Sequence, residues 1–115
     1  MGSTYFGGVT AMSTQDFAIV NGYSNGFWGW GGEDDDLYNR VTLHNLTITH
    51  PFPAKMARYT ALNHQRAKPN SDRFLALNRS TELRSVDGLA DLNYRTIRMK
   101  LEPLYTHILV DLTPI

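Results

Sequence analysis

Residues 27–36 read FWGWGGEDDD, and the rest of the chain can be interpreted outward from them. The run of four carboxylates from Glu33 to Asp36 creates mutual repulsion, so it must be solvated, bound to a cation or used in chemistry. Acidic side chains are favoured in the first turn of a helix because they face its positive end. Leu37 and Val41 then follow at helical spacing. We therefore expect a helix that opens at Glu33.

The glycines and tryptophans ahead of this helix indicate a carbohydrate site. Four glycines lie between Gly26 and Gly32, where they leave the backbone open to a flat ligand. Trp28 and Trp30 offer apolar ring faces for a sugar, and carboxylates accept hydrogen bonds from its hydroxyls. An acidic helix start alone is commonly a solvated face, and a lone loop Trp commonly packs inside. An EF-hand is excluded because its ligands alternate with other residues. The conjunction favours sugar binding.

Composition narrows the class of protein. The chain has 115 residues, 42% of them hydrophobic, which is enough for one ordered domain. Eleven basic and eleven acidic residues balance, so no overall field attracts nucleic acid or an anionic membrane. The absence of cysteine excludes disulfides, thiolate zinc sites and a cysteine nucleophile. No apolar run approaches the length of a membrane span. A soluble domain of mixed α and β structure is expected.

The remaining elements are predicted from short patterns. Ser13 is expected to cap a short helix that ends at Asn21-Gly22. Strands are expected over 5–12, 46–49, 94–99 and 104–112, a loop over 63–72 and a turn over 87–89.

With these residues in view, the chain resembles the β-1,4-galactosyltransferases, inverting enzymes of the Golgi lumen with the GT-A type of α/β fold. The resemblance covers residues 5–111. It is carried by Trp-Gly-Trp-Gly-Gly-Glu-Asp-Asp-Asp at 28–36 together with Tyr5-Phe6-Gly7-Gly8-Val9, Asn21-Gly22, Asn39-Arg40, His64, Arg73-Phe74, Asp87-Gly88-Leu89 and Pro103-Leu104-Tyr105-Thr106.

The resemblance implies that galactose passes from UDP-galactose to the 4-hydroxyl of a terminal N-acetylglucosamine (GlcNAc). It makes Asp34 the general base, with Glu33 beside it as a second catalytic residue. A sugar hydroxyl is a poor nucleophile, and such base catalysis supplies about 10²–10⁴-fold. The acceptor-binding residues implied are Tyr5, Gly31, Gly32, Glu33, Asp34, Asp35, Arg73, Phe74 and Leu77. Tyr5 also stands where the family selects galactose over N-acetylgalactosamine.

On the donor side, the resemblance implies that Trp30, His64, Gln65 and Arg66 contact the nucleotide-sugar. His64 is also the implied ligand of a Mn²⁺ cofactor, an ion that accepts imidazole and oxygen ligands. The chain departs from the family pattern at Ala61, where a second metal ligand, Met, is usual. It also departs at Ala67, where an acid is usual.

The domain organisation is expected to be partial. Residues 1–4 look like an artificial or truncated start, and 5–115 like the C-terminal, acceptor-binding half of the catalytic domain. The nucleotide-binding half with its Asp-x-Asp motif, and a membrane anchor, are expected on a missing N-terminal part. The isolated chain should then be inactive or nearly so. Two alternatives stay open, a non-enzymatic carbohydrate- or partner-binding module and a β-1,4-N-acetylgalactosaminyltransferase. Triplets at Asn45 and Asn78 fit the N-glycosylation pattern of a luminal protein.

Overall fold

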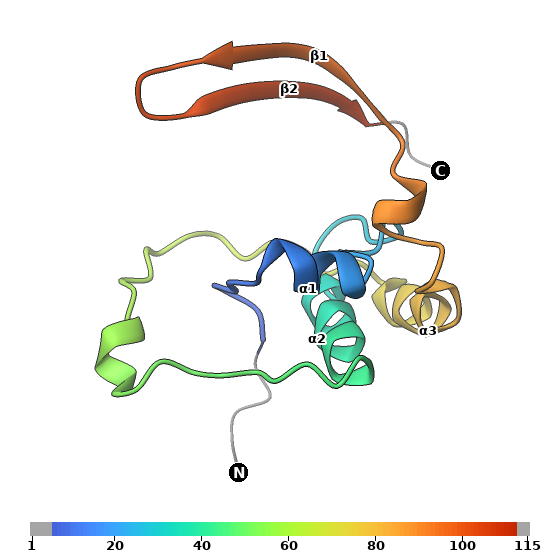
Figure 1. Ribbon diagram of the computed structural model, residues 1–115, viewed down its shortest axis with the longest axis horizontal. Coiled ribbons are helices and arrows are strands. Elements are labelled where there is room, and N and C mark those ends of the chain that lie inside the picture. The colour runs from blue at the N-terminus through green and yellow to red at the C-terminus, as the bar shows by residue number, and fades with distance from the viewer. Residues whose placement is uncertain (1–5, 113–115) are drawn as a thin grey trace.

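The computed structural model describes residues 6–112, which form a small mixed helix and strand protein (Figure 1). The expected mixture of α and β structure is confirmed. Tyr5 lies outside the described residues. In chain order the elements are helix α1 (Thr14–Ile19), helix α2 (Glu33–Leu43), the 3₁₀ turn η1 (Ala54–Ala57), helix α3 (Arg73–Leu83), the 3₁₀ turn η2 (Leu89–Asp91), and strands β1 (Tyr94–Leu101) and β2 (Thr106–Leu112).

Helix α1 begins and ends as its sequence predicts. The Ser13 hydroxyl accepts a hydrogen bond from the backbone N–H of Asp16 at 3.0 Å, which satisfies a free donor of the first turn. After the helix, Asn21 and Gly22 adopt positive φ angles of 61° and 64°. Asn and Gly tolerate this left-handed conformation, so the chain turns sharply there.

The core lies between the end of α1 and the inner face of α2. Val20, Leu37 and Val41 are its fully buried apolar residues, each at most 3% exposed. Leu37 and Val41 are one helical turn apart, so they present one face, as the spacing predicts. Partly buried apolar residues pack around these three: Phe6, Met12, Leu46 and Ile48.

A single guanidinium joins α2 to α3 and to the turn before η2. Arg40 is 1% exposed, and its Nε donates to the Asp36 carboxylate at 2.8 Å. Its Nη2 donates to the Ser80 hydroxyl on α3 at 3.0 Å. Its Nη1 donates to the carbonyls of Gly22 at 3.2 Å and Asp87 at 2.8 Å. The hydrogen bond to Ser80 links α2 to α3, and those to Gly22 and Asp87 link α2 to the turns at these residues. We call Arg40, Asp36, Ser80 and Asp87 the Arg40 cluster.

Strands β1 and β2 form an antiparallel hairpin that arches away from the helices (Figure 1). The register runs from the pair Tyr94–Leu112 to the pair Leu101–Thr106, with an irregularity between Thr96 and Arg98. Both strands were predicted. Apolar side chains on both strands are largely exposed, including Ile97 at 56% and Ile108 at 50%.

Two predicted strands are wrong, and one helix was not foreseen. Residues 6–12 and 46–49 have no regular structure. Their β-prone residues have no strand to pair with in the described part of the chain, and Gly8 has a φ of 100° that interrupts extension. Leu46 and Ile48 instead pack against the core with their side chains partly buried. Helix α3 was not predicted, although the turn at 87–89 and the loop from 63 to the start of α3 were.

None of the helices within residues 6–112 has the length and apolar character needed to cross a membrane.

Candidate active site

The aromatic and glycine loop is held against the start of α3 by Asn70. The Asn70 backbone N–H donates to the Trp30 carbonyl at 3.0 Å, and its side-chain amide donates to the Trp28 carbonyl at 2.7 Å. Trp30 and Pro69 form an isolated parallel bridge at the same point. Trp30 keeps 55% of its surface exposed, so a ring face is available to a ligand.

Gly31 and Gly32 allow this loop to lie directly on Arg73. Both have left-handed φ angles, 108° and 99°, which side chains rarely adopt. A Cβ on Gly31 would come 2.9 Å from the Arg73 Cδ, and one on Gly32 would come 2.9 Å from the Phe27 ring. Three residues that sequence selected for acceptor binding are therefore brought together.

The acidic string divides into three carboxylates that face solvent to some degree and one that is buried. Glu33 and Asp35 are exposed and Asp34 is half-buried, all in the first turn of α2. Asp36 is 2% exposed and belongs to the Arg40 cluster. The helix twist separates the side chains in this way, so burial relieves part of the repulsion and leaves Glu33, Asp34 and Asp35 at the surface.

The Asp34 carboxylate has two defined neighbours. Its Oδ1 accepts a hydrogen bond from the Asp35 backbone N–H at 3.0 Å. On the other side it lies against Gly7, where an added Cβ would overlap Oδ2 and come 3.2 Å from Cγ. Gly7 therefore leaves the space that the Asp34 carboxylate occupies.

The pKa of Tyr23 is affected by the negative charge of the acidic string. Partial burial raises the pKa of the Tyr23 phenol above its usual 10.0, and the negative charges of Asp34 and then Glu33 raise it further. Both effects disfavour a phenolate, the first by removing solvent and the second by repulsion between like charges. Tyr23 therefore belongs to the electrostatic surroundings of the carboxylates.

Three of the expected acceptor-binding residues, Arg73, Phe74 and Leu77, lie at the N-terminal end of α3. The guanidinium carbon of Arg73 lies 4.4 Å from the centre of the Phe74 ring, a cation–π contact. Its Nη1 donates to the Asn70 carbonyl at 3.0 Å. Phe74 is 62% exposed and Leu77 is half-buried one turn further on. An apolar surface with one cation therefore borders the loop at Gly31.

The residues expected on the donor side lie on a different segment. His64, Gln65 and Arg66 are exposed on the irregular segment between η1 and Pro69. The His64 Nδ1 lies 2.9 Å from the backbone carbonyl oxygen of Gln65. Within residues 6–112, no three His, Asp or Glu side chains come together as a metal site. The described residues do not by themselves fit a Mn²⁺ ion, because His64 offers one imidazole and no companion ligand.

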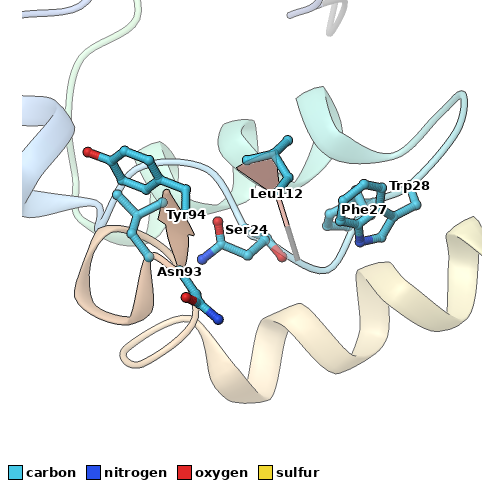
Figure 2. A pocket seen from close by; sticks show the side chains of 8 residues that line it. Ser24, Phe27, Trp28, Asn93, Tyr94 and Leu112 are labelled. Carbon is cyan, nitrogen blue, oxygen red and sulfur yellow. The ribbon is translucent and has the colours of Figure 1, made fainter. Parts of the chain in front are cut away.

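A cavity of about 270 Å³ opens between the aromatic loop and the base of the hairpin (Figure 2). Three aromatic rings and several amide or hydroxyl groups line it, as is common in small-molecule sites. The lining residues are Ser24, Asn25, Phe27, Trp28, Leu92, Asn93, Tyr94 and Leu112. None of them belongs to the acidic string or to the start of α3.

Sequence reasoning included Arg40, Asp87 and Gly7 among the residues that carry the resemblance but did not predict how they support the site. Asp87 was noted as part of a turn, yet its Oδ1 accepts from the Asn25 backbone N–H at 2.7 Å and it also accepts from the Ser24 hydroxyl. Asp87 and Arg40 thus anchor the chain just before the aromatic loop. The only local signal was that Arg40 falls on the apolar face of α2, between Leu37 and Val41. The pairing of Gly7 with Gly8 indicated a close approach to the backbone but not its partner, and Asn70 gave no local signal.

Comparison with known proteins identifies the family to which the chain is similar. A family model described as the N-terminal domain of galactosyltransferase matches residues 1–65. Beta-1,4-galactosyltransferase 4 of Cricetulus griseus is 47% identical over 112 residues, which is 95% of this chain and 32% of the relative. The Homo sapiens beta-1,4-galactosyltransferase 4 is 44% identical over the same shares. The Homo sapiens beta-1,4-galactosyltransferase 1 is 42% identical over 94% of this chain and 28% of the relative.

The comparisons thus place the chain among the glycosyltransferases. It belongs to the β-1,4-galactosyltransferase family. It spans about a third of the length of the curated relatives it matches. The matching family model is described as an N-terminal domain, so it does not bear out the expectation that this chain is a C-terminal half.

Proposed function

We propose that this chain contributes the acceptor site and the general base of an inverting β-1,4-galactosyltransferase. Galactose would pass from UDP-galactose to the 4-hydroxyl of a terminal GlcNAc on a glycan. The observation that carries the proposal is that Gly31, which follows Trp30, lies against the Arg73 side chain at the start of α3, while Asp34 is half-buried in the first turn of α2 a few residues further on. Membership of the galactosyltransferase family supports the reaction class.

Asp34 is the residue suited to remove the acceptor proton. It is less exposed than Glu33 and Asp35, and its Oδ1 is already oriented by the Asp35 N–H. As the acceptor O4 attacks the anomeric carbon of galactose, the C1–O4 bond forms and the bond from C1 to the UDP oxygen breaks. The bonding electrons leave with UDP, and the O4 proton moves to Asp34. Attack opposite the leaving group inverts the anomeric centre.

The acceptor sugar would be held by complementary surfaces. An exposed Trp30 ring provides a face for the sugar, and the carboxylates of Glu33 and Asp35 accept hydrogen bonds from its hydroxyls. The apolar part of Phe74 and Leu77, with Arg73 beside them, suits an acetamido group, which has both a methyl and a carbonyl. These roles are the ones that the family resemblance implies, and the chemistry of the side chains is compatible with them.

The donor site would depend on polypeptide outside this chain. Gln65, Arg66 and Trp30 are proposed to contact UDP-galactose, and His64 to offer one ligand to Mn²⁺ with other ligands from elsewhere. When bound, the ion would neutralise charge on the diphosphate leaving group. We propose that the chain is the C-terminal, acceptor-binding part of a Golgi luminal enzyme. As an isolated polypeptide it would bind GlcNAc without turnover, the behaviour of a carbohydrate-binding module.

The test uses the whole enzyme that carries this sequence, with UDP release measured in the presence of UDP-galactose, Mn²⁺ and GlcNAc. Asp34→Asn keeps the shape of the side chain and removes the base, so we expect kcat to fall by about 10²–10⁴-fold. The matched control is Glu82→Gln, an exposed carboxylate at the far end of α3, which should leave kcat unchanged. Near-normal turnover by the Asp34 variant would remove it as the base.

A further inference from the structure

Two triplets with the N-glycosylation pattern occupy very different places in the structure. Asn45-Leu46-Thr47 follows the C-terminal end of α2, and Asn78-Arg79-Ser80 lies inside α3. The pattern is read on surface loops, where the asparagine and the hydroxyl two residues later are both accessible. Because sequence alone treats the two triplets alike, the structure is what separates them.

The first triplet has the geometry of an accessible acceptor. Asn45 is exposed and turns the chain with a φ of 55°, after which the backbone runs without regular structure. The turn is stabilised by the backbone, since the N–H groups of Asn45 and Leu46 donate to the carbonyls of Thr42 at 3.0 Å and Val41 at 3.1 Å. Thr47 is also exposed, and no hydrogen bond among residues 6–112 engages its hydroxyl or the Asn45 carboxamide.

The second triplet is explained by packing. Asn78 has helical backbone in the middle of α3. The hydroxyl that completes the pattern belongs to Ser80, which is 3% exposed and accepts a hydrogen bond from the Arg40 Nη2 at 3.0 Å. Ser80 is therefore needed as a small buried acceptor for a guanidinium. The resemblance of 78–80 to a glycosylation signal follows from that structural role.

We infer that Asn45 carries an N-linked oligosaccharide and that Asn78 does not. In this modification the Asn45 carboxamide nitrogen attacks the first sugar carbon of an oligosaccharide linked to a polyprenyl diphosphate. The N–C bond forms, the bond from that carbon to the diphosphate oxygen breaks, and the carboxamide loses one proton as the diphosphate leaves. The inference rests on the proposed function only for the luminal location.

An oligosaccharide at Asn45 would leave the acceptor site free. Asn45 follows the last turn of α2, whereas Asp34 lies in the first turn. At 1.5 Å per residue the two are separated by about 15 Å along the helix axis. A glycan on Asn78 would instead stand one residue from Leu77, next to the proposed acetamido pocket. The modified position is therefore compatible with catalysis by the same helix.

The experiment is a site-occupancy measurement on the whole enzyme, secreted from cultured animal cells behind a secretory leader so that lumen entry does not depend on the proposed function. Peptide:N-glycosidase digestion in ¹⁸O-water labels each formerly glycosylated asparagine as aspartate, and mass spectrometry reads it. We expect the label at Asn45 and none at Asn78. Asn45→Gln should remove one glycan from the intact mass, and the matched control Asn78→Gln should remove none.

A second variant removes any dependence on the fold of the turn. Thr47→Ala destroys the signal but keeps Asn45 in its left-handed position, and it should lose the same glycan. Unlabelled Asn45 in the secreted enzyme, or label at Asn78, would overturn the inference. Because occupancy is read by mass, these outcomes are independent of whether the enzyme transfers galactose.

Discussion

Replacing Arg40 by Met should loosen the joint between α2 and α3 more than any other single change to an ion pair here. The guanidinium makes four hydrogen bonds and lies 3.6 Å from the Asp87 carboxylate. Met fills a similar volume but leaves the Asp36 side chain, 3% exposed, without its cation. Removing one partner of a buried pair typically costs about 3–5 kcal/mol. Asp87 keeps the Asn25 N–H, so most of the cost should arise at Asp36.

The assay is native-state hydrogen exchange on the whole enzyme, which reports the opening free energy of α2 and α3 separately. We expect Arg40→Met to lower that free energy in both helices by about 3–5 kcal/mol, up to the limit of their own stability. The matched control is Arg95→Met, which breaks the exposed pair with Asp111 and should cost no more than about 1 kcal/mol.

A double variant separates lost attraction from a stranded charge. Asp36→Leu together with Arg40→Met removes the unpaired carboxylate, so it should cost less than the sum of the two single changes. The reasoning would be refuted if Arg40→Met matched Arg95→Met, or if the double variant were fully additive.

Two further predictions concern the neighbours of Asp34. Gly7→Ala places a methyl group where the Asp34 Oδ2 lies, so it should displace the carboxylate and lower kcat at least about 10-fold, within the range that base catalysis supplies. The control Gly26→Ala, whose added Cβ would lie 3.4 Å from its nearest side-chain atom, should leave kcat unchanged. Equal values of kcat for the two variants would contradict the contact between Gly7 and Asp34. Asp34→Asn or Glu33→Gln should lower the pKa of Tyr23 toward its usual 10.0, although the larger effect of burial would remain. Ultraviolet titration of the phenol measures this pKa. An unchanged titration midpoint would show that the two carboxylates do not affect Tyr23.

Elements defined by local patterns were predictable from the sequence. The cap at Ser13, the turn at Asn21-Gly22 and the acidic opening of α2 depend on residues within one or two turns of each other. The two strands of the hairpin were predictable because 94–99 and 104–112 are β-prone, whereas their pairing came from the structure. In contrast, the β-prone run at 46–49 has no partner strand among residues 6–112, and a strand without a partner cannot satisfy its backbone groups.

Features that depend on distant residues were not predictable. Helix α3 shows only weak hydrophobic periodicity, and its Phe74 is exposed. Its one fully buried residue among those described is Ser80, which is held by Arg40, 40 positions away in the sequence. Likewise, no local rule indicates that Asp36 is the acid of the string that becomes buried. The Arg40 guanidinium that pairs with Asp36 also donates to the carbonyl of Asp87, 47 positions after Arg40. Glu33, Asp34 and Asp35 could be named from the family resemblance, but the network around the buried Asp36 required the structure.

The hairpin has a practical consequence for work with this segment alone. A two-stranded ribbon is only marginally stable in water, and this one offers unpaired backbone along its outer edges and apolar side chains above and below. A second copy of the chain could cover these edges and apolar side chains, so the hairpin favours self-association. Yield and dispersity of the purified 115-residue piece should therefore depend steeply on concentration, and charged substitutions at Ile97 and Ile108 offer a way to keep it in solution without touching the carboxylates of α2.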